Sequence, residues 1–419
     1  MSAGNLKPRW GQPLTGIIAT VCFLFIAWAT WYIFGDPRGP IGWFPQPFVM
    51  ILAMMILVGV WQHMLFGNWP FQGRPPHLQG IAMIAVNAFL VWFVIEVVFY
   101  RMFGAGVNFL NYYDLVAASG KAASGNIARS AVVGFVLIGF FAYPVFTILL
   151  GKWPVDQGNL SQPRKGVAEL AVGSLLALIF YALFVAPMFT QSAANPAWWT
   201  NIAGTSHLHW TFGWYEWCII VLFLTATVWR GKPWNLLPLP HPARGFAAIG
   251  LVMALSYVIA VFCNNVVTPM IMPAEAFEFA KSKIAAANQD VDANTLQLLQ
   301  SREVMRVVWH HSAEIAGFFL FPFLIWHNFF DDKAPGGMNL DSWRAFLFRT
   351  VGCIVFAAIG YCLYYHVNWG SWALGNPHMG HGIGERWVDG ESLLWNFWFI
   401  IPLLWCAWFF NKWPFYVSK

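Results

Sequence analysis

Several stretches of more than 20 residues contain almost no ionisable side chain, which leaves very few folds open to this chain. Two examples run from Pro13 to Gly35 and from Ser130 to Gly151. About 20 apolar residues are what an α-helix needs to cross the roughly 30 Å hydrocarbon core of a bilayer. In that core every backbone amide must pair within its own segment, so these stretches should be helices. The sequence therefore predicts an all-α, polytopic transmembrane helix bundle.

The composition supports this prediction. Hydrophobic residues make up 59% of the 419 residues and charged residues only 10%, and the mean hydropathy is +0.57. A soluble protein of this length needs more charge to cover its surface. The net charge of +5 does not indicate nucleic-acid binding, because the basic residues lie in loops or near the ends of the apolar stretches. We therefore expect the lipid bilayer, and no nucleic acid, as the main partner.

The apolar stretches predict about ten spans. The first begins near Pro13 and has no small-residue cleavage site, so we interpret it as a span and not as a signal peptide. The six cysteines all fall within predicted spans and form no Cys-x-x-Cys pair, as expected of small buried side chains. The predicted spans are 14–34, 46–66, 78–103, 130–152, 167–189, 210–230, 244–269, 304–328, 343–366 and 391–411.

A short motif recurs after the even-numbered spans, at a period of about 80 residues, which is the length of one helical hairpin. Its proline ends the helix, its tryptophan is typical of the headgroup level, and its lysine can reach lipid phosphates. The repeat predicts five helical hairpins in a single membrane domain, 1–419. The copies are Gly67-Asn68-Trp69-Pro70-Phe71, Gly151-Lys152-Trp153-Pro154-Val155, Gly231-Lys232-Pro233-Trp234 and Asn411-Lys412-Trp413-Pro414-Phe415, with a weaker copy at Asp332-Lys333-Ala334-Pro335.

The distribution of Lys and Arg predicts the orientation. The face with both termini and the loops after even-numbered spans carries 14 of the 23 Lys and Arg residues. By the positive-inside rule, both termini of this multi-pass protein should be cytoplasmic, in the cell inner (plasma) membrane. The largest loop, 271–303, would then be an extramembrane segment on the outer face. Helical spacing over 274–287 predicts that it forms short amphipathic helices.

Histidines and carboxylates gather toward the predicted outer half of the membrane. Span six opens with His207 and His209, and Glu216 lies two turns deeper on the same face as His209. Span eight opens with His310-His311, and His310 shares a helical face with Glu314, four residues later. An ionisable residue within a span costs several kcal/mol unless it faces a partner or water, so such residues indicate a functional site. We expect no comparable group in the inner half.

These residues could bind a transition metal. Imidazole and carboxylate together suit Cu, Fe or Zn, and histidines can also hold haem. The candidate metal ligands are His207, His209, His310, His311 and His366, the last at the outer end of span nine. Glu216 and Glu314 are candidate catalytic residues, as ligands or proton donors. The alternative is that each histidine is an interfacial side chain hydrogen-bonded to its own neighbours.

Two resemblances to known families are limited. His207-Leu208-His209-Trp210, followed by Glu216 and later by His310-His311, resembles the non-haem metal site of the nitric oxide reductase branch of the haem-copper oxidases. A whole predicted span separates the two motifs, however, and no His-x-His span follows them, so we do not assign the chain to that family. Ten helices in five hairpins also resemble the fold of the tellurite-resistance and slow-anion-channel family, whose sequence motifs are absent.

Three functions are compatible with these features. The first is an integral membrane redox protein or enzyme, dependent on a metal or haem, that acts on a small or lipophilic substrate from the outer, periplasmic half of the bilayer. The second is a transporter or channel for a small solute or metal ion that uses the same His/Glu cluster for protonation or binding. The expected lack of polar groups in the inner half argues against transport of a charged solute. The third is a scaffold subunit that binds other membrane subunits.

Overall fold

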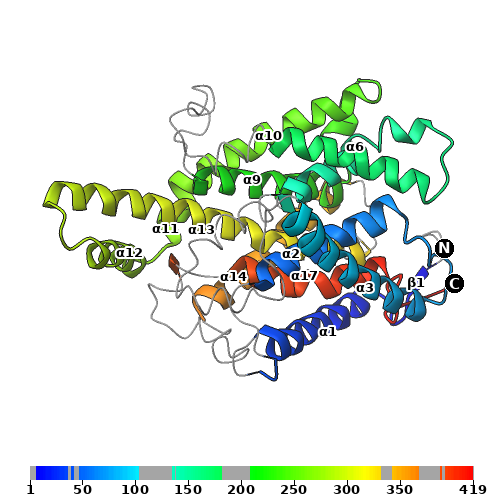
Figure 1. The fold of residues 1–419 in the computed structure, drawn as a ribbon, viewed down its shortest axis with the longest axis horizontal. Helices are drawn as coiled ribbons and strands as arrows, with labels where there is room; N and C mark the ends of the chain where they lie inside the picture. Colours follow the sequence, from blue (N-terminus) through cyan, green and yellow to red (C-terminus); the bar gives the residue numbers. More distant parts are fainter. Residues whose placement is uncertain are drawn as a thin grey trace.

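The computed structural model describes residues 6–35, 39–41, 47–102, 135–136, 138–181, 208–331, 342–367, 387–388 and 392–418. Most of this part of the chain is helical, and it contains almost no sheet. The two described strands, β1 (Leu6–Pro8) and β2 (Tyr416–Ser418), pair antiparallel and hold the two ends of the chain together. Figure 1 shows both termini at one end of the molecule, which we call the terminus end, and α12 at the opposite end, the α12 end.

Several of the helices continue into a π-helical last turn. In chain order the helical elements are α1 (Leu14–Thr30), η2 (Trp31–Gly35), α2 (Pro47–Val60), η3 (Trp61–Leu65), α3 (Pro76–Trp92), η4 (Phe93–Met102), η5 (Val145–Leu149), η6 (Val155–Gln157), α6 (Arg164–Phe180), α9 (Leu208–Phe223), η8 (Leu224–Val228), η9 (Trp234–Leu236), α10 (Ala243–Phe262), η10 (Cys263–Val267), α11 (Thr268–Ile271), α12 (Ala274–Ala287), α13 (Ala293–Phe329), α14 (Trp343–Tyr365) and α17 (Ser392–Trp408).

Five helices are long and apolar enough to cross a membrane, and they coincide with the first, third, seventh, eighth and ninth predicted spans. They are Leu14–Phe34, Pro76–Phe99, Ala243–Ile271, Ala293–Phe329 and Trp343–Tyr365. Shorter apolar helices cover Ile51–Leu65, Ile138–Leu149, Gly213–Val228 and Asn396–Trp408, within four further predicted spans.

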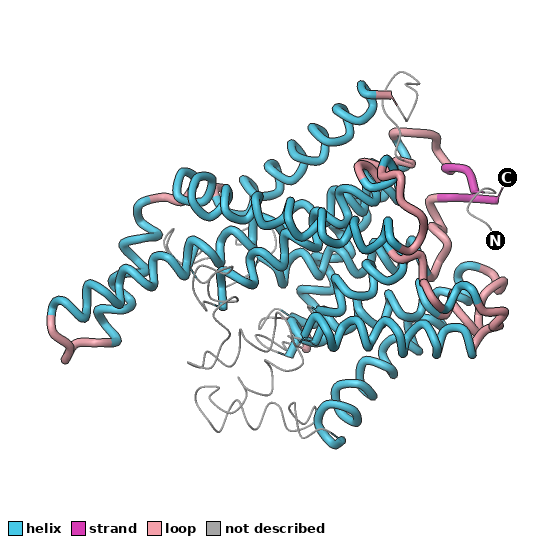
Figure 2. Tube along the Cα trace, turned by 90° about the horizontal axis from the view of Figure 1, so that it is seen from above, coloured by secondary structure: helices cyan, strands magenta, loops and turns pink. Residues whose placement is uncertain are grey.

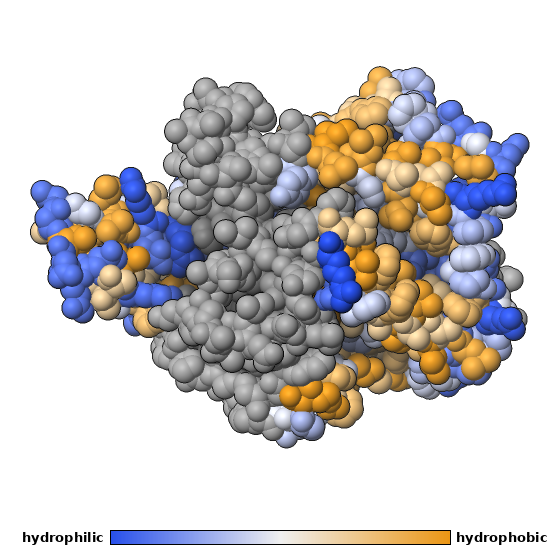
Figure 3. Space-filling model, in the orientation of Figure 1, coloured by the Kyte–Doolittle hydropathy of each residue, from blue (hydrophilic) through white to orange (hydrophobic). Residues whose placement is uncertain are grey.

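The surface has the pattern expected of a protein embedded in lipid. Large apolar side chains of α1, among them Ile17, Val21 and Phe25, are exposed. In the part of the surface that Figure 3 colours, hydrophobic residues predominate between the two ends, apart from one hydrophilic patch near the middle, and hydrophilic residues gather at both ends. Exposed apolar surface of this extent is unfavourable in water but is the normal surface of a helix in a bilayer.

Helix α13 is the centre of the bundle. In its apolar window 72% of residues are buried, against 22% to 28% in the other four long helices. It packs against α9, α14 and α17, while α10 packs on α9, and α1 and α2 pack on α17. Glycines permit close approach at these contacts. A Cβ on Gly213 of α9 would lie 3.2 Å from the Trp309 carbonyl oxygen of α13, which is tighter than almost all real contacts.

Four helices end in the same wide turn, at the copies of the repeated motif. Each turn has two consecutive residues with positive φ, and the N–H of the second donates to the carbonyl oxygen six residues earlier. These bonds satisfy carbonyl groups that a helix end otherwise leaves without donors. The bonds run from Asn68 to Gln62, Lys152 to Phe146, Gly231 to Thr225 and Lys412 to Cys406.

The segment 271–303 forms a helical hairpin that projects from the bundle. Its first arm is α12, and its second arm is the start of α13, which begins at Ala293 and not at residue 304 as the predicted span does. Asp292 caps α13 by accepting hydrogen bonds of 3.0 Å from the N–H groups of Asn294 and Thr295. With 37 residues α13 is about 55 Å long. Its first turns therefore extend beyond the bundle, as Figures 1 and 2 show.

Candidate functional site

The candidate site begins with a short polar run on the buried part of α13. His311, Ser312 and Glu314 are all 1% exposed or less, although apolar residues surround them along the helix. His311 and Glu314 are three residues apart, so they share a face of the helix. The Trp217 indole donates a 3.3 Å hydrogen bond to the Ser312 hydroxyl and ties α9 to this stretch. The polar run is thus held by its neighbours on both sides.

His311 uses both of its ring nitrogens. Its Nδ1 lies 3.1 Å from Oε2 of Glu314, and its Nε2 lies 2.7 Å from the hydroxyl oxygen of Tyr361 on α14. In either neutral tautomer one nitrogen donates and the other accepts, and in the charged form both donate. The ring is therefore a hydrogen-bonded link between a carboxylate and a phenol.

Glu314 has a second strong partner. The Tyr365 hydroxyl donates a 2.5 Å hydrogen bond to the same oxygen, Oε2, that faces His311. Tyr361 and Tyr365 are four residues apart on α14, so both phenols point from one face toward α13. We call His311, Glu314, Tyr361 and Tyr365 the His–Glu–Tyr cluster.

Aromatic rings enclose this cluster. The His311 ring lies 4.7 Å from the Tyr365 ring and 4.8 Å from that of Trp387, and the Tyr365 and Trp387 rings are 4.6 Å apart. Phe318 contacts Tyr361 and Tyr365 from the next turn of α13. Rings packed at these distances leave little room for water, so the electrostatic interactions inside are stronger than at a surface.

His310 and His366 lie at the edge of the cluster. Nε2 of His310 is 3.7 Å from Oε1 of Glu314, within ion-pair distance but too far for a hydrogen bond, and its side chain is 25% exposed. His366 is exposed, and its ring lies 5.3 Å from Trp387 and 6.2 Å from Tyr361. The structure therefore brings His310, His311 and Glu314 together and leaves His366 beside them.

The two histidines of span six are described only in part. His207 lies outside the described residues, as does the predicted loop triplet around Met379. The backbone of His209 is in the first turn of α9, but its side chain is not described. One turn later, a Cβ on Gly213 would lie 3.2 Å from the Trp309 carbonyl oxygen and 3.8 Å from the Ala313 nitrogen, so the start of α9 lies at the level of His310.

Glu216 lies in a separate cavity, which we call the Glu216 cavity. This cavity has a volume of about 60 Å³ between α9, α13, α17, α2 and the helix Ile138–Leu149. Glu216 is 8% exposed, and most of the residues that line the cavity around it are apolar. The other polar side chain in the described lining is Asn396 of α17. Glu216 is thus a buried carboxyl group in apolar surroundings, which favour its neutral form.

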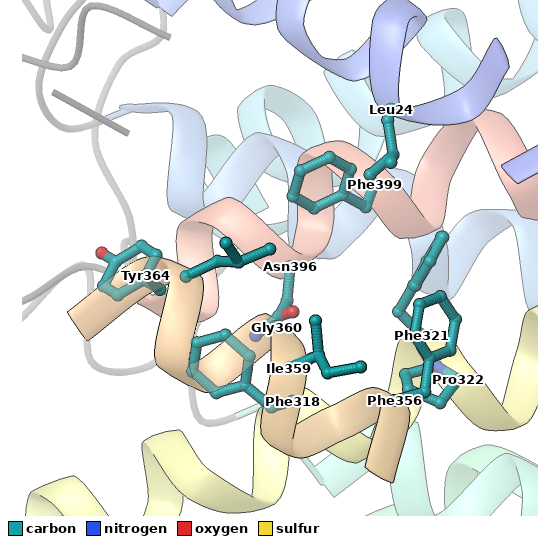
Figure 4. A pocket seen from close by; sticks show the side chains of 11 residues that line it. Leu24, Phe318, Phe321, Pro322, Phe356, Ile359, Gly360, Tyr364, Asn396 and Phe399 are labelled. Atoms are coloured by element: carbon teal, nitrogen blue, oxygen red, sulfur yellow. The ribbon is translucent and has the colours of Figure 1, made fainter. Parts of the chain in front are cut away.

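A second cavity of about 110 Å³, the aromatic cavity, lies between α1, α13, α14 and α17. Phe318, Phe321, Phe356 and Phe399 line it, and Asn396 lines it too. Figure 4 shows the Asn396 side chain reaching from α17 toward Gly360 of α14. Because Asn396 lines both cavities, it is the polar side chain that lies between them. Its Nδ2 is buried and has no hydrogen-bond partner among the described residues.

The expectation that the inner half holds no group comparable to the outer histidines and carboxylates is wrong, because it contains a buried carboxylate. Toward the terminus end Glu169 is fully buried and lies 2.8 Å from Nζ of Lys152. The Asn87 amide donates a 2.8 Å hydrogen bond to Oε1 of Gln62, and both side chains are buried. Composition did not reveal these groups, because amides between helices, and an ion pair near a helix end, change the mean hydropathy of a span very little.

Sequence reasoning missed four contributors to the site. Tyr361 and Tyr365 carried a usable signal, since two phenols four residues apart in a span share one face. A lone amide in a span, such as Asn396, is also a signal, because it must find a partner away from water. Nothing in the sequence around Trp387 indicates that its ring would cover His311.

The described residues form a chain of hydrogen bonds along which a proton can move, and they do not form a complete metal site. Among the described residues no three His, Cys, Asp or Glu side chains lie together in a way that could hold a metal ion. His310 and Glu314 supply two ligand groups at most, while the His–Glu–Tyr cluster is a continuous chain of three hydrogen bonds. Comparisons of the chain with protein-family models, curated proteins and solved structures find no match.

Proposed function

We propose that the chain is a ten-span membrane protein of five hairpins, with both termini cytoplasmic and the α12 end on the outer face of the cell inner membrane. The five long helices, the shorter apolar helices and the four repeated turns support this architecture. The excess of Lys and Arg on the terminus side supports the orientation.

We propose that this protein is a proton-coupled transporter of a small solute, with Glu314 as its proton-binding group. One observation carries the proposal: His311 is fully buried and bonds to Glu314 through one ring nitrogen and to Tyr361 through the other. A histidine held this way can pass a proton between two groups, but it has no nitrogen left for a metal unless one bond breaks.

The hydrogen bonds explain how the cluster can hold a charge that changes. When Glu314 is ionised, the His311 N–H and the Tyr365 hydroxyl both donate to its Oε2 and stabilise the charge. When Glu314 is protonated, the carboxyl group is neutral and suits its buried site. His310 lies 3.7 Å from the other oxygen and is partly exposed, so it is the group through which a proton can arrive from the α12 end.

The buried polar groups farther along the bundle remove the main objection to transport. On α17 the described lining of the Glu216 cavity runs from Asn396 to Trp408, a distance of about 18 Å by helical rise. At the far end of this lining the Trp408 ring stacks on His63 at 5.2 Å. Polar side chains thus occur at both levels of the bundle, which a pathway across the membrane needs.

Uptake into proteoliposomes tests this function. The purified chain is reconstituted, a pH gradient is imposed, and entry of labelled ammonium, neutral and anionic small solutes is measured. We expect at least one solute to enter faster with the gradient than without it, and Glu314→Gln to lose that dependence. Glu96→Gln is the matched control, because Glu96 is equally buried but pairs with Arg101 away from the cluster. Gradient-independent uptake by wild type, or an unchanged Glu314→Gln variant, would contradict the proposal.

A metal- or haem-dependent redox protein is the second candidate. The specific observation in its favour is that Glu314 and His310 approach each other at the level where α9, with His209 in its first turn, meets α13. A Cu, Fe or Zn ion there would draw its remaining ligands from His207, His209, His311 and His366. Metal analysis of protein purified from native membranes decides the matter. Stoichiometric metal that His310→Ala removes would favour this candidate over transport.

A further inference from the structure

The Glu216 cavity has the features of a binding site for a small cation. Glu216 and Asn396 are both more than nine-tenths buried and line the same cavity, and the Nδ2 of Asn396 has no hydrogen-bond partner among the described residues. An ionised carboxylate without a partner in apolar surroundings costs several kcal/mol, so the group must bind either a proton or another cation. A single buried carboxyl group can therefore exchange one for the other.

The lining favours an organic ammonium ion over a metal ion. Hard cations need several oxygen ligands, and the described side chains of this cavity supply only the oxygens of Glu216 and Asn396. Four of the lining residues are aromatic, and aromatic faces attract ammonium groups. They are Phe140, Phe223, Phe397 and Trp408. A volume of about 60 Å³ holds a few waters or one small ammonium ion, and Gly317 of α13 adds no side chain to fill it.

We propose that Glu216 binds a small primary ammonium ion, of the size of methylammonium, in exchange for its proton. In this step the O–H bond of the Glu216 carboxylic acid breaks and the proton leaves to solvent. The carboxylate then accepts hydrogen bonds from the ammonium group, so one positive charge replaces another. This inference names the class of solute that the proposed transporter would carry. The transport of the ion rests on the proposed function, whereas its binding at Glu216 does not.

Few other ionisable groups face Glu216. On its own helix Tyr215 and Cys218 are close enough to interact with its charge, and the Tyr215 hydroxyl donates to the Ile138 carbonyl oxygen. The described lining from α2, α13, α17 and Ile138–Leu149 contains no ionisable side chain. His63 lies behind Trp408. A pH-dependent exchange in this cavity would therefore report on Glu216.

Equilibrium dialysis of labelled methylammonium against the detergent-purified chain tests the site, and a pH dye in weak buffer counts the protons released. We expect one proton released per ion bound, and an affinity that falls by up to about tenfold per pH unit on acidification. Glu216→Gln should lose both signals at an unchanged melting temperature. Asn396→Leu should bind about ten- to a hundredfold more weakly. Tetramethylammonium, which has no N–H group to donate to the carboxylate, should not compete.

Other results separate this inference from the proposed function. Glu314→Gln should bind methylammonium like wild type even though it loses proton-coupled uptake. Binding that persists in Glu216→Gln, binding without proton release, or no binding by wild type would overturn the ammonium site. If methylammonium did not bind but the proteoliposomes showed Glu314-dependent uptake of another solute, the proposed transport function would hold and the ammonium site would not. Binding at Glu216 without uptake of any solute would support the ammonium site and contradict the proposed transport function.

Discussion

The Tyr365 hydroxyl donates a 2.5 Å hydrogen bond to Oε2 of Glu314, which joins two helices through residues 51 positions apart in the chain. The same carboxylate oxygen faces His311, so a single atom connects the phenols of α14 with the imidazole of α13. The cluster therefore depends on how α13 and α14 pack, as well as on the spacing of residues within α13.

Tyr365→Phe should destabilise the protein by about 2 kcal/mol, because it removes a hydrogen bond to the buried Glu314 side chain and leaves its Oε2 with one partner fewer. Thermal unfolding in detergent measures this loss. Tyr361→Phe is the matched control, since its phenol bonds to Nε2 of His311 and does not touch Glu314, and this substitution should cost about 1 kcal/mol. Equal effects of the two substitutions would contradict the central position of Glu314.

Helix α10 offers a test of close packing with an internal control. A Cβ on Gly245 would lie 2.5 Å from the Leu149 carbonyl oxygen, and a backbone atom cannot turn aside as a side chain can. We expect Gly245→Ala to destabilise the protein by about 1–3 kcal/mol. Gly250 on the same helix has no atom within 4 Å of its would-be Cβ, so Gly250→Ala should instead gain up to about 1 kcal/mol of helix propensity. Melting temperatures that shift in the same direction for both would argue against this packing.

The start of α13 should respond to acid. Hydrogen bonds from the Thr295 hydroxyl and from the Thr295 and Asn294 N–H groups hold the pKa of Asp292 below its usual value of 3.8. A carboxyl group with a lowered folded pKa stabilises the helix at pH values above 3.8, and this stabilisation is lost as the pH falls through the folded pKa. Carbon NMR of Asp292, assigned with Asp292→Asn, should show the midpoint below 3.8. A midpoint at or above 3.8 would mean that the cap does not form.

Thiol labelling tests the proposed orientation. In a chain without native cysteines, Asp156→Cys should resist an impermeant reagent in intact cells, because residue 156 follows a Trp-Pro turn on the cytoplasmic side. Asp290→Cys, at the tip of the α12 hairpin, should react. Both positions are exposed, so access to the reagent and not burial decides the result. The opposite pattern would place the His–Glu–Tyr cluster in the cytoplasmic half.

Much of the helical framework could be predicted from the sequence, because membrane helices are recognised by their length and their apolar composition. Leu14–Phe34 and Trp343–Tyr365 match their predicted spans to within one residue. The start of α13 was predicted eleven residues too late, since its polar first turns lie outside the apolar window and depend on the Asp292 cap.

The candidate site could be predicted only in part. The spacing of His310, His311 and Glu314 places them together because one helix carries all three. Their partners on other helices depend on how the helices pack, which the spacing of residues along the sequence does not predict. Tyr365 and Trp387 were missed for this reason. Either Glu216 or His366 was expected close to His310, His311 and Glu314. His366 lies at the edge of the cluster, and the structure describes Glu216 in the lining of a separate cavity, with Asn396.

Proton flux in proteoliposomes tests the central claim most directly. A pH dye inside the vesicles reports proton movement when a transported solute is added outside. Wild type and Glu96→Gln should change the internal pH at similar rates, because Glu96 lies outside the cluster. Glu314→Gln should change it at least tenfold more slowly, since its amide cannot carry a proton. Equal rates in all three proteins would show that Glu314 is not the proton-binding group.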